Sequence, residues 1–442
     1  MSSLVLRSQR VVLPDGERPA TVVVEGGRIA AVLDHDAEVD AAEIVDLGDD
    51  ALLPGLVDTH VHVDEPGRTE WEGFATATRA AAAGGVTTIV DMPLNSLPPT
   101  VDPQALAAKR QAAAGQLFVD VGCWGGAVPS NLGRLGELHA AGVLGFKCFT
   151  TDSGVPEFPP LTWLQVRAAL RELAAFDGLL LVHAEDAAVL AGAPAATGDS
   201  YPAFVASRPA RAEVSAVREL VAALRETGGR AHVLHVSAAA AAAEVARARA
   251  DGVRITAETC PHYLALTADG AGADASDKCC PPIRDAANRE ALWARLADGA
   301  LDCVVSDHSP CPPELKQGGL ANAWGGISSL QLGLSVVWTH ARTRGHQLTD
   351  VVRWMADAPA RLAGLAGKGR IAVGCDADLV AFAPEQAWVV TPAALHHRHP
   401  GTPYANHRLV GRTRRTWLRG RPVTDQPFGG LLSGVTWAPH RT

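Results

Sequence analysis

Between residues 54 and 368, short apolar runs alternate with longer segments in which apolar residues recur at helical spacing. Such runs are typical of buried strands, and spacings of three and four residues are typical of amphipathic helices. The expected strands are 56–60, 87–91, 118–124, 145–149, 179–183, 231–235, 254–258 and 303–307. The clearest helical segments are 72–83, 103–114, 163–176, 213–226 and 238–250. Eight strands that alternate with helices predict an α/β fold of the (β/α)8 TIM-barrel type.

Short strands separated by polar turns are expected at both ends of the chain. Near the start they are 4–6, 11–13, 21–24 and 29–32, and the same texture returns at 369–380 and 416–423. Neither end is large enough to bury a core alone, so we expect the two to pair into one small β-sandwich domain. The predicted organisation is a small domain built from residues 1–53 and 369–442, with a barrel of residues 54–368 between them.

The composition sets limits on the class of protein. A chain of 442 residues with 47% hydrophobic content can bury a large core, and its net charge of -9 is spread without a basic segment that would favour nucleic acid. The first residues lack the pattern of a signal peptide, and no apolar run is long enough to cross a membrane. The eight cysteines show no CxxC spacing, so we expect reduced thiols in a cytoplasmic protein.

The candidate chemistry begins at the end of the first barrel strand, where one residue separates His60 from His62. Side chains alternate along a strand, so the two imidazoles point to the same face. They could be two metal ligands or a hydrogen-bonded pair of core histidines, and an isolated pair would favour the second interpretation. The metal hypothesis gains weight because later strands also end in residues that bind divalent metals.

These further residues fall at the carboxyl ends of strands, where barrel enzymes carry their chemistry. Lys147 lies in the fourth strand, and a buried amine readily loses its proton and can take up carbon dioxide as an anionic carbamate. An ion pair with a carboxylate is the alternative. The fifth and eighth strands end at His183 and Asp307. The sixth contains His232 and His235 on opposite faces, and we choose His235 because it stands at the strand end.

Taken together, these motifs resemble the amidohydrolase superfamily, and within it the cyclic amidases: allantoinases, dihydropyrimidinases (hydantoinases) and dihydroorotases. The resemblance covers nearly the whole chain. It implies two divalent metal ions, most readily Zn, with Mn, Co or Ni as alternatives. It also implies a homo-oligomer, expected to be a homotetramer. By this resemblance the first metal is held by His60, His62, Lys147 and Asp307, and the second by His183, His235 and the carbamate of Lys147 (N6-carboxylysine).

Departures from these groups decide which cyclic amide we expect. Dihydroorotases typically carry an arginine two residues after the second histidine, whereas this chain has Asp64, a carboxylate that would repel dihydroorotate. Hydantoinases typically carry a tyrosine shortly after the carboxylated lysine, and none follows Lys147. The stretches that instead look like allantoinases are 65–68, 71–73, 91–95, 145–149, 260–263, 281–284 and 306–314.

The expected reaction is therefore hydrolysis of allantoin to allantoate, with Asp307 as the catalytic acid and base. One alternative is a hydantoinase-like amidase of another specificity. The other, from a different class, is a non-catalytic assembly protein like some dihydropyrimidinase relatives, which have lost metal ligands that this chain retains.

Other residues near the strand ends are weaker candidates. Asn95, Cys280 and Ser309 are expected to contact the substrate, although Asn95 could instead satisfy its own backbone and Cys280 stands where serine is usual. The segment 324–326 could be a lid over the site or ordinary packing. The three remaining candidates are expected at the solvated surface: His396, His397 and His399.

Overall fold

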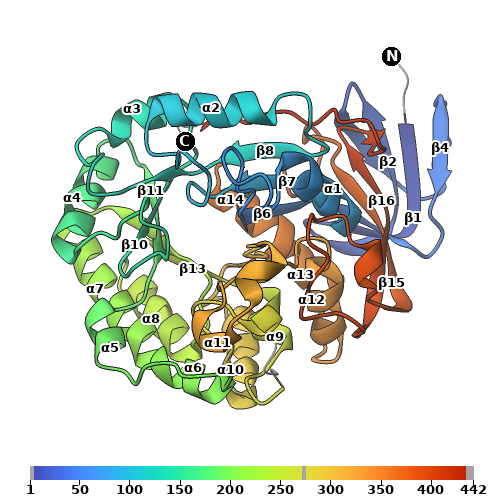
Figure 1. The fold of residues 1–442 in the computed structure, drawn as a ribbon. Helices are drawn as coiled ribbons and strands as arrows, with labels where there is room; N and C mark the ends of the chain where they lie inside the picture. Colours follow the sequence, from blue (N-terminus) through green and yellow to red (C-terminus); the bar gives the residue numbers. More distant parts are fainter. Residues whose placement is uncertain (1–3, 271–274, 435–442) are drawn as a thin grey trace.

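A closed barrel of parallel strands lies beside a mixed β-sheet in the computed structural model, which describes residues 4–270 and 275–434 (Figure 1). All pairs between neighbouring barrel strands are parallel. In chain order these strands are β6 (Leu56–Val61), β7 (Val86–Asp91), β8 (Asp120–Cys123), β9 (Gly125–Gly126), β10 (Phe146–Phe149), β11 (Leu179–His183), β12 (Arg230–Val233), β13 (Ile255–Thr259) and β14 (Cys303–Val304).

The barrel closes at two places where the strand order is interrupted. Only Trp124 separates β8 from β9, so the two form one continuous wall. At the other place Val61, at the end of β6, forms a parallel bridge with His308, and the His62 amide donates to the His308 carbonyl at 2.8 Å. The predicted (β/α)8 barrel is therefore confirmed, and its first and last strands meet at the candidate metal ligands.

Helices cover the outside of the barrel (Figure 1). The five predicted helices are present with ends shifted by a few residues, and no helix of the described residues is long and apolar enough to cross a membrane. The main helices are α1 (Phe74–Gly84), α2 (Pro103–Ala113), α4 (Trp163–Ala174), α7 (Ala210–Thr227), α8 (Ala239–Ala250), α10 (Ala286–Ala297) and α12 (Gly333–Arg342).

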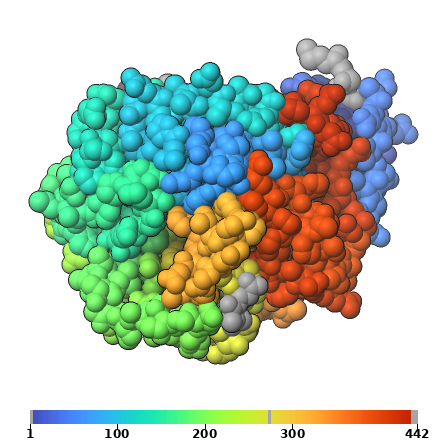
Figure 2. Space-filling model, in the orientation of Figure 1, coloured from blue at the N-terminus to red at the C-terminus, as the bar shows by residue number. Residues whose placement is uncertain are grey.

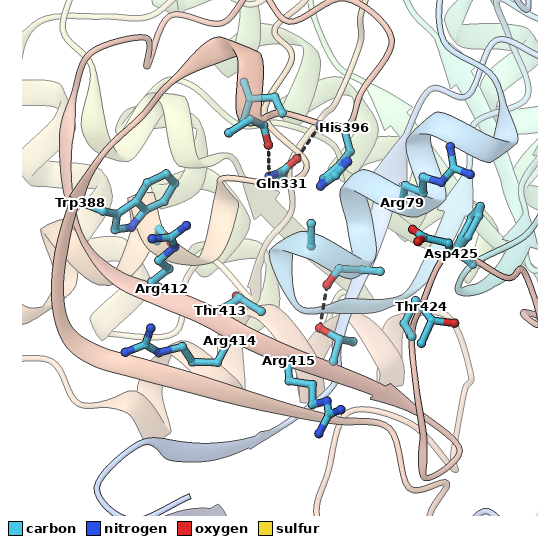
Figure 3. Close-up of a pocket in the computed structure, with 18 residues that line it drawn as sticks. Arg79, Gln331, Trp388, His396, Arg412, Thr413, Arg414, Arg415, Thr424 and Asp425 are labelled. Carbon is cyan, nitrogen blue, oxygen red and sulfur yellow. Dashed lines mark hydrogen bonds between the residues drawn. The ribbon is translucent and has the colours of Figure 1, made fainter.

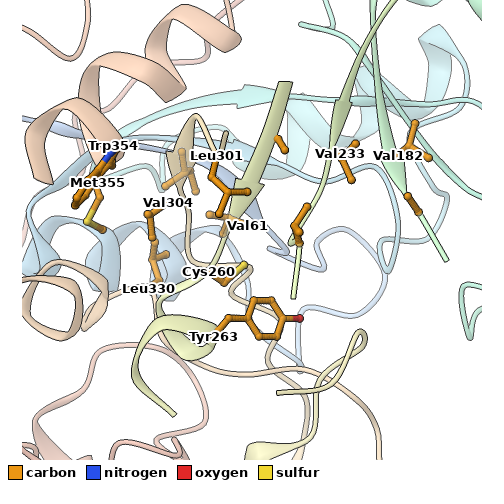
Figure 4. Close-up of a cluster of buried hydrophobic side chains, with 14 of the residues drawn as sticks. Val61, Val182, Val233, Cys260, Tyr263, Leu301, Val304, Leu330, Trp354 and Met355 are labelled. Carbon is orange, nitrogen blue, oxygen red and sulfur yellow. The ribbon is translucent and has the colours of Figure 1, made fainter. Parts of the chain in front are cut away.

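Alternate side chains of the barrel strands pack into two different layers. Val182 and Val233 belong to the large cluster between strands and helices, part of which is drawn in Figure 4. Leu181 and Leu234 belong to a second cluster that fills the barrel interior. Burying a side chain of this size contributes roughly 1.5–3 kcal/mol relative to leaving it exposed. The alternation determines which residues face the interior, and therefore which can meet at its open end.

The second sheet draws its strands from both ends of the chain, shown in blue and red in Figure 1. Its order is β17-β16-β15-β5-β1-β2-β3, and β4 pairs with β1. The small β domain of the prediction corresponds to this sheet, although residues 1–3 and 435–442 of that prediction lie outside the described residues. The strands are β1 (Leu4–Leu13), β2 (Gly16–Glu25), β3 (Arg28–Leu33), β4 (Glu43–Asp46), β5 (Ala51–Pro54), β15 (Leu379–Val389), β16 (Arg408–Leu418) and β17 (Arg421–Pro422).

Two details of this sheet differ from the sequence prediction. The expected strands 4–6 and 11–13 are one strand whose register shifts after Ser8, because the Ser8 hydroxyl accepts from the Arg10 amide and donates to the Asp50 carbonyl. Most of 369–380 is irregular, and only its last two residues enter β15. In both places local hydrogen bonds compete with the regular ladder.

The chain beyond β17 returns to the barrel. Leu431 forms a parallel bridge with Val121 of β8, and the Leu432 amide donates to the Val121 carbonyl at 2.8 Å. Nearby, the Lys368 ammonium lies 2.7 Å from both Asp120 of β8 and Asp378. The barrel and the second sheet are thus joined by paired backbone and by a buried ionic cluster.

The long segment between β14 and α12 covers the open end of the barrel. It carries α11 (Gly319–Asn322) and fills the centre of the face shown in Figure 2, where it is coloured orange. Two lysines hold its backbone: Lys316 donates to the Trp324 and Gly326 carbonyls, and Lys278 donates to the Ala323 carbonyl at 2.6 Å. The segment is therefore secured by charge-assisted hydrogen bonds.

Candidate metal centre

Three of the predicted ligands meet where β6 and the end of β14 approach each other. His60 Nε2 lies 3.1 Å from Asp307 Oδ1, and His62 Nε2 lies 3.7 Å from the same oxygen. All three side chains are buried, and each offers one ligand atom within 4.8 Å of the others. Two imidazoles and a carboxylate at this spacing match the donor set of a Zn or Mn site.

The other three predicted ligands lie against this group. Lys147 Nζ is 3.4 Å from His60 Nε2, so the lysine enters the cluster from β10. His183 Nδ1 is 2.9 Å from His235 Nε2, and the His60 and His235 rings have centroids 5.3 Å apart. The structure thus brings all six predicted residues together at the carboxyl ends of the barrel strands.

Two of these residues reach the centre because their backbones leave the strand conformation. His235 has φ of 37° and Asp307 has φ of 45°, in the left-handed region that non-glycine residues rarely adopt. Simple alternation would turn His235 away from the barrel interior, as it does Val233. The left-handed turn brings it back, and unfavourable backbone of this kind is often concentrated at functional sites.

His232 belongs to the same buried cluster as His235, which differs from the prediction. It was expected on the face opposite His235, yet it is fully buried with its Nε2 3.0 Å from Glu258 Oε2. Glu258 also bonds the ring of His60 and the backbone of His235. The two histidines therefore serve the same cluster, because alternation stops at the end of β12.

In three of the histidines, one ring nitrogen has a hydrogen-bond partner outside the ligand group, and the other ring nitrogen faces the cluster. His60 Nδ1 is bonded to Glu258, His62 Nδ1 lies 3.3 Å from the Asn95 amide, and His183 Nε2 lies 2.7 Å from Glu185. These contacts leave His60 Nε2 and His183 Nδ1 for a metal, whereas His62 Nε2 is free only when the Asn95 amide presents its oxygen to Nδ1, because an N–H donor there would leave the proton on Nε2. Carboxylates that orient histidine ligands in this way are a common feature of metal sites.

The protonation of the cluster also suits divalent cations. Burial lowers the pKa of His62, His183 and His235, so these imidazoles are neutral and have free lone pairs. Burial would raise the pKa of Asp307, but the charge and hydrogen bond of His60 hold it well below the usual value. His60 differs from the other three imidazoles: burial would lower its pKa, but the charge of Asp307 raises it. Histidines bind metals in the neutral form, so His60 would release its proton to a bound cation.

Lys147 is the unusual member of the group. Burial lowers its pKa to about 8, although the charges of Asp307 and Glu258 oppose the shift. A substantial fraction of the amine is therefore neutral near physiological pH, which is the form that reacts with carbon dioxide. An unmodified ammonium would be repelled by two dications, so the donor set fits the metals best if Lys147 becomes a carbamate.

The residues expected to contact substrate occupy different positions. The Asn95 amide faces His62, while Ser309 donates its amide to the Ile327 carbonyl at 3.0 Å and lies too close to Gly326 for a Cβ there. Cys280 is partly buried and packs near Gly325. Their roles toward the substrate stay predictions, although Asn95 already has a partner among the candidate ligands.

The segment around Trp324 packs against the loop that follows β6. The Trp324 and Trp71 rings meet edge to face with centroids 5.0 Å apart, and the Arg68 guanidinium lies 5.1 Å from the Trp71 ring. The sequence left open whether the segment 324–326 is a lid over the site or ordinary packing, and these ring contacts show packing.

Sequence reasoning missed several buried polar residues around the cluster. His262 is fully buried, and burial lowers its pKa to about 4; it forms a possible three-ligand group with Cys260 and Asp307. Glu258 lies on the inward phase of a predicted strand, so counting alternate residues could have identified it. No local signal indicated the others, because their partners are distant in the sequence.

Two further expectations are corrected by burial. His397, expected at the surface, is only 3% exposed and its ring centroid lies 5.5 Å from that of His308. Asp64, expected to repel dihydroorotate, is fully enclosed, and burial together with the charge of Asp91 raises its pKa well above the usual value. Only the missing arginine therefore disfavours dihydroorotate as a substrate.

A hollow between α1 and β16 lies away from this centre (Figure 3). Its labelled arginines point in different directions, and Arg412 lies over the Trp388 ring while Arg79 lies over the Phe118 ring. None of the candidate ligands lines it. These side chains do not converge on a common point, so we assign no chemistry to the hollow.

Comparison with known proteins places this geometry in context. Residues 51–421 match the model of the amidohydrolase family. An allantoinase of Streptomyces avermitilis is 56% identical, with 97% of this chain and 98% of that protein covered, and an allantoinase of Arabidopsis thaliana is 42% identical, with 95% and 87% covered. The L-hydantoinase (dihydropyrimidinase) of Arthrobacter aurescens superimposes with a TM-score of 0.93 at 30% identity, with 98% and 100% covered.

Proposed function

Because the chain belongs to the amidohydrolase family, we propose that it hydrolyses the hydantoin ring of allantoin and releases allantoate. The observation that carries the proposal is the convergence of four imidazoles, one lysine and one carboxylate in a buried group at the open end of the barrel. The choice of allantoin is supported by the allantoinases that are 56% and 42% identical along nearly the whole chain.

We infer that two divalent cations, preferably Zn, occupy the centre. His60, His62 and Asp307 would hold one and His183 and His235 the other, with the carbamate of Lys147 between them. When bound, such cations supply Lewis acidity toward a carbonyl oxygen and toward water. The nitrogen and oxygen donors also accept Mn, Co or Ni.

Asp307 is the proposed acid and base. It is ionised and lies at the cluster, 3.1 Å from His60, so it can accept the proton released when water attacks the ring carbonyl. It then returns this proton to the departing ring nitrogen. General acid and base assistance of this type is typically worth about 10²- to 10⁴-fold in rate.

Substrate choice is the part of the proposal with a close competitor, since a hydantoinase shares the fold at 30% identity. The residues after Lys147 offer no phenol to a developing oxyanion. Phe149 instead stacks on the ring of His183 with centroids 4.6 Å apart. We therefore expect a substrate whose reaction does not depend on a hydroxyl from this position.

The test is a hydrolysis panel of allantoin, hydantoin, dihydrouracil and dihydroorotate with the metal-loaded protein. Allantoin should give the highest kcat/KM by at least tenfold. A higher value for hydantoin or dihydrouracil would replace the proposal with a hydantoinase-like activity. No hydrolysis of any of the four by metal-loaded protein would favour the non-catalytic alternative.

The homotetramer and the cytoplasmic location remain proposals. Light scattering combined with size-exclusion chromatography would test the first, since a single-chain mass of 46.1 kDa would contradict an oligomer.

A further inference from the structure

Glu258 lies between the two halves of the candidate metal centre. One carboxylate oxygen, Oε1, is bonded to the Nδ1 of His60 and also accepts the backbone amide of His235 at 3.3 Å. His60 and His235 are proposed ligands of different cations. A single oxygen atom thus contacts one ligand of each cation.

The other oxygen of Glu258 is held from the opposite side. His232 Nε2 lies 3.0 Å from Oε2, and His232 Nδ1 lies 2.7 Å from the Thr256 hydroxyl. Glu258 and His232 are fully buried, and Thr256 is partly exposed. Because water is excluded, the protein itself must orient the carboxylate.

The two contacts of Oε1 control different properties. The hydrogen bond that Oε1 accepts from His60 Nδ1 keeps the proton on that nitrogen. His60 Nε2 therefore faces Lys147 and Asp307. The hydrogen bond that Oε1 accepts from the His235 amide stabilises the backbone of His235, whose φ of 37° is unfavourable by itself. Movement of the Glu258 carboxylate would therefore disturb both the ring of His60 and the backbone of His235.

Glu185 offers a useful contrast, because it supports only one ligand. It bonds His183 Nε2 at 2.7 Å and is held by Arg208, whose Nε donates to Oε1 at 3.1 Å. Glu185 touches the ring of a single histidine, whereas Glu258 contacts both halves of the centre.

We propose that Glu258, held in place by His232, is a positioning residue that fixes His60 and His235 together and so sets the affinity of both metal positions. The inference rests on the proposed two-metal centre and goes beyond it by assigning a role to two residues that are not among the six proposed ligands. Outer partners of metal ligands typically contribute 10- to 100-fold in affinity. Here one change should weaken both positions.

The experiment measures metal affinity rather than hydrolysis. Metal-free protein is titrated with Zn²⁺ in competition with a chromophoric chelator at fixed bicarbonate, and the absorption spectrum of the Co²⁺-loaded protein reports ligand geometry. His232→Leu should weaken both binding steps by at least tenfold and change the Co²⁺ spectrum. His232→Gln, whose amide can still donate to Glu258, should bind within about threefold of the unaltered protein.

A matched control comes from the same buried group. Cys303 offers a ligand atom within 4.8 Å of those of His232 and Glu258, yet the described residues show no hydrogen bond from its side chain to either. Cys303→Ala therefore disturbs packing at the same depth without removing the support, and should leave both affinities unchanged. Glu258→Met, of similar length but without the two acceptor oxygens, provides a second test if His232→Leu does not fold, and should weaken both steps by at least tenfold.

Several results would overturn the proposal. Unchanged affinities in folded His232→Leu or Glu258→Met would do so, as would weakening of one step alone. Equal weakening in Cys303→Ala would indicate a general packing effect. Because none of these readouts uses allantoin, they remain separate from the substrate panel: the proposed hydrolysis can fail while this affinity pattern holds, and the reverse.

Discussion

Glu72 and His308 form a buried pair beside the candidate metal ligands, with Glu72 Oε2 3.2 Å from His308 Nε2. His308 follows Asp307 directly, and its carbonyl accepts the amide of His62 at 2.8 Å. Glu72 also accepts the backbone amide of Arg398 at 3.1 Å, from the loop before β16. The pair thus connects two candidate ligands with a segment from the other end of the chain.

This relationship predicts that Glu72→Ala lowers both stability and activity. Removing the carboxylate leaves the His308 ring and the Arg398 amide without their partner, which costs about 1–3 kcal/mol for a buried group. Loosening His308 should also lower kcat by shifting Asp307. Thermal unfolding and allantoin hydrolysis test this, with Glu70→Ala as control because that side chain is exposed. Equal behaviour of the two variants would contradict the supporting role.

The purified protein should contain two divalent metal ions per chain. Exhaustive chelation should abolish hydrolysis, and addition of Zn²⁺ with bicarbonate should restore it. Elemental analysis before and after chelation is the direct measurement. Full activity in protein shown to be free of metal would exclude the proposed mechanism.

Asp307→Asn should retain the metal at His183 and His235, since neither contact involves the altered side chain. Turnover should fall by about 10²- to 10⁴-fold because the amide cannot accept the proton. A suitable control is Asp302→Asn, which lies before β14 and pairs with Arg249 at the opposite end of the strand. Near-normal kcat in Asp307→Asn would remove this residue from the role of base.

Lys147→Ala should lose the group that joins the two metals. The alanine side chain supplies no oxygen at this position, so both metal content and activity should fall. Short carboxylic acids added with excess metal should partly restore activity by filling the vacated space. Two tightly bound metals and normal activity without added acid would show that Lys147 is only a buried structural lysine.

The pKa of Lys147 predicts how carbamate formation depends on pH. Burial lowers this pKa to about 8, so the amine is charged below pH 8 and neutral above it, and only the neutral form takes up carbon dioxide. At constant dissolved carbon dioxide, the neutral fraction rises from roughly a tenth at pH 7 to about half at pH 8. Carbon-13 NMR of metal-free protein with labelled bicarbonate measures the adduct, and Lys147→Ala supplies the background. A signal independent of pH in this interval would contradict the assigned pKa.

The sequence by itself determined the barrel and the candidate ligands. Alternation within strands and helical spacing between them are local properties, visible in residues that are neighbours in the chain. Polar residues at strand ends follow the same logic, because parallel strands bring their carboxyl ends to one side. His60, His62, Lys147 and His183 could be singled out from the sequence because each lies on or directly after a regular strand, and their assignment as metal ligands followed from the resemblance to the cyclic amidases.

Only the tertiary structure decided how the centre is held together. His60 and Glu258 are separated by 198 residues, and their contact depends on two strands meeting across the barrel. His235 and Asp307 turn inward through left-handed backbone that alternation cannot predict. His397 is buried because a loop from the end of the chain packs on His308. Long-range packing selects these partners and offsets the free-energy cost of the left-handed backbone. Neither effect produces a periodic pattern in the sequence.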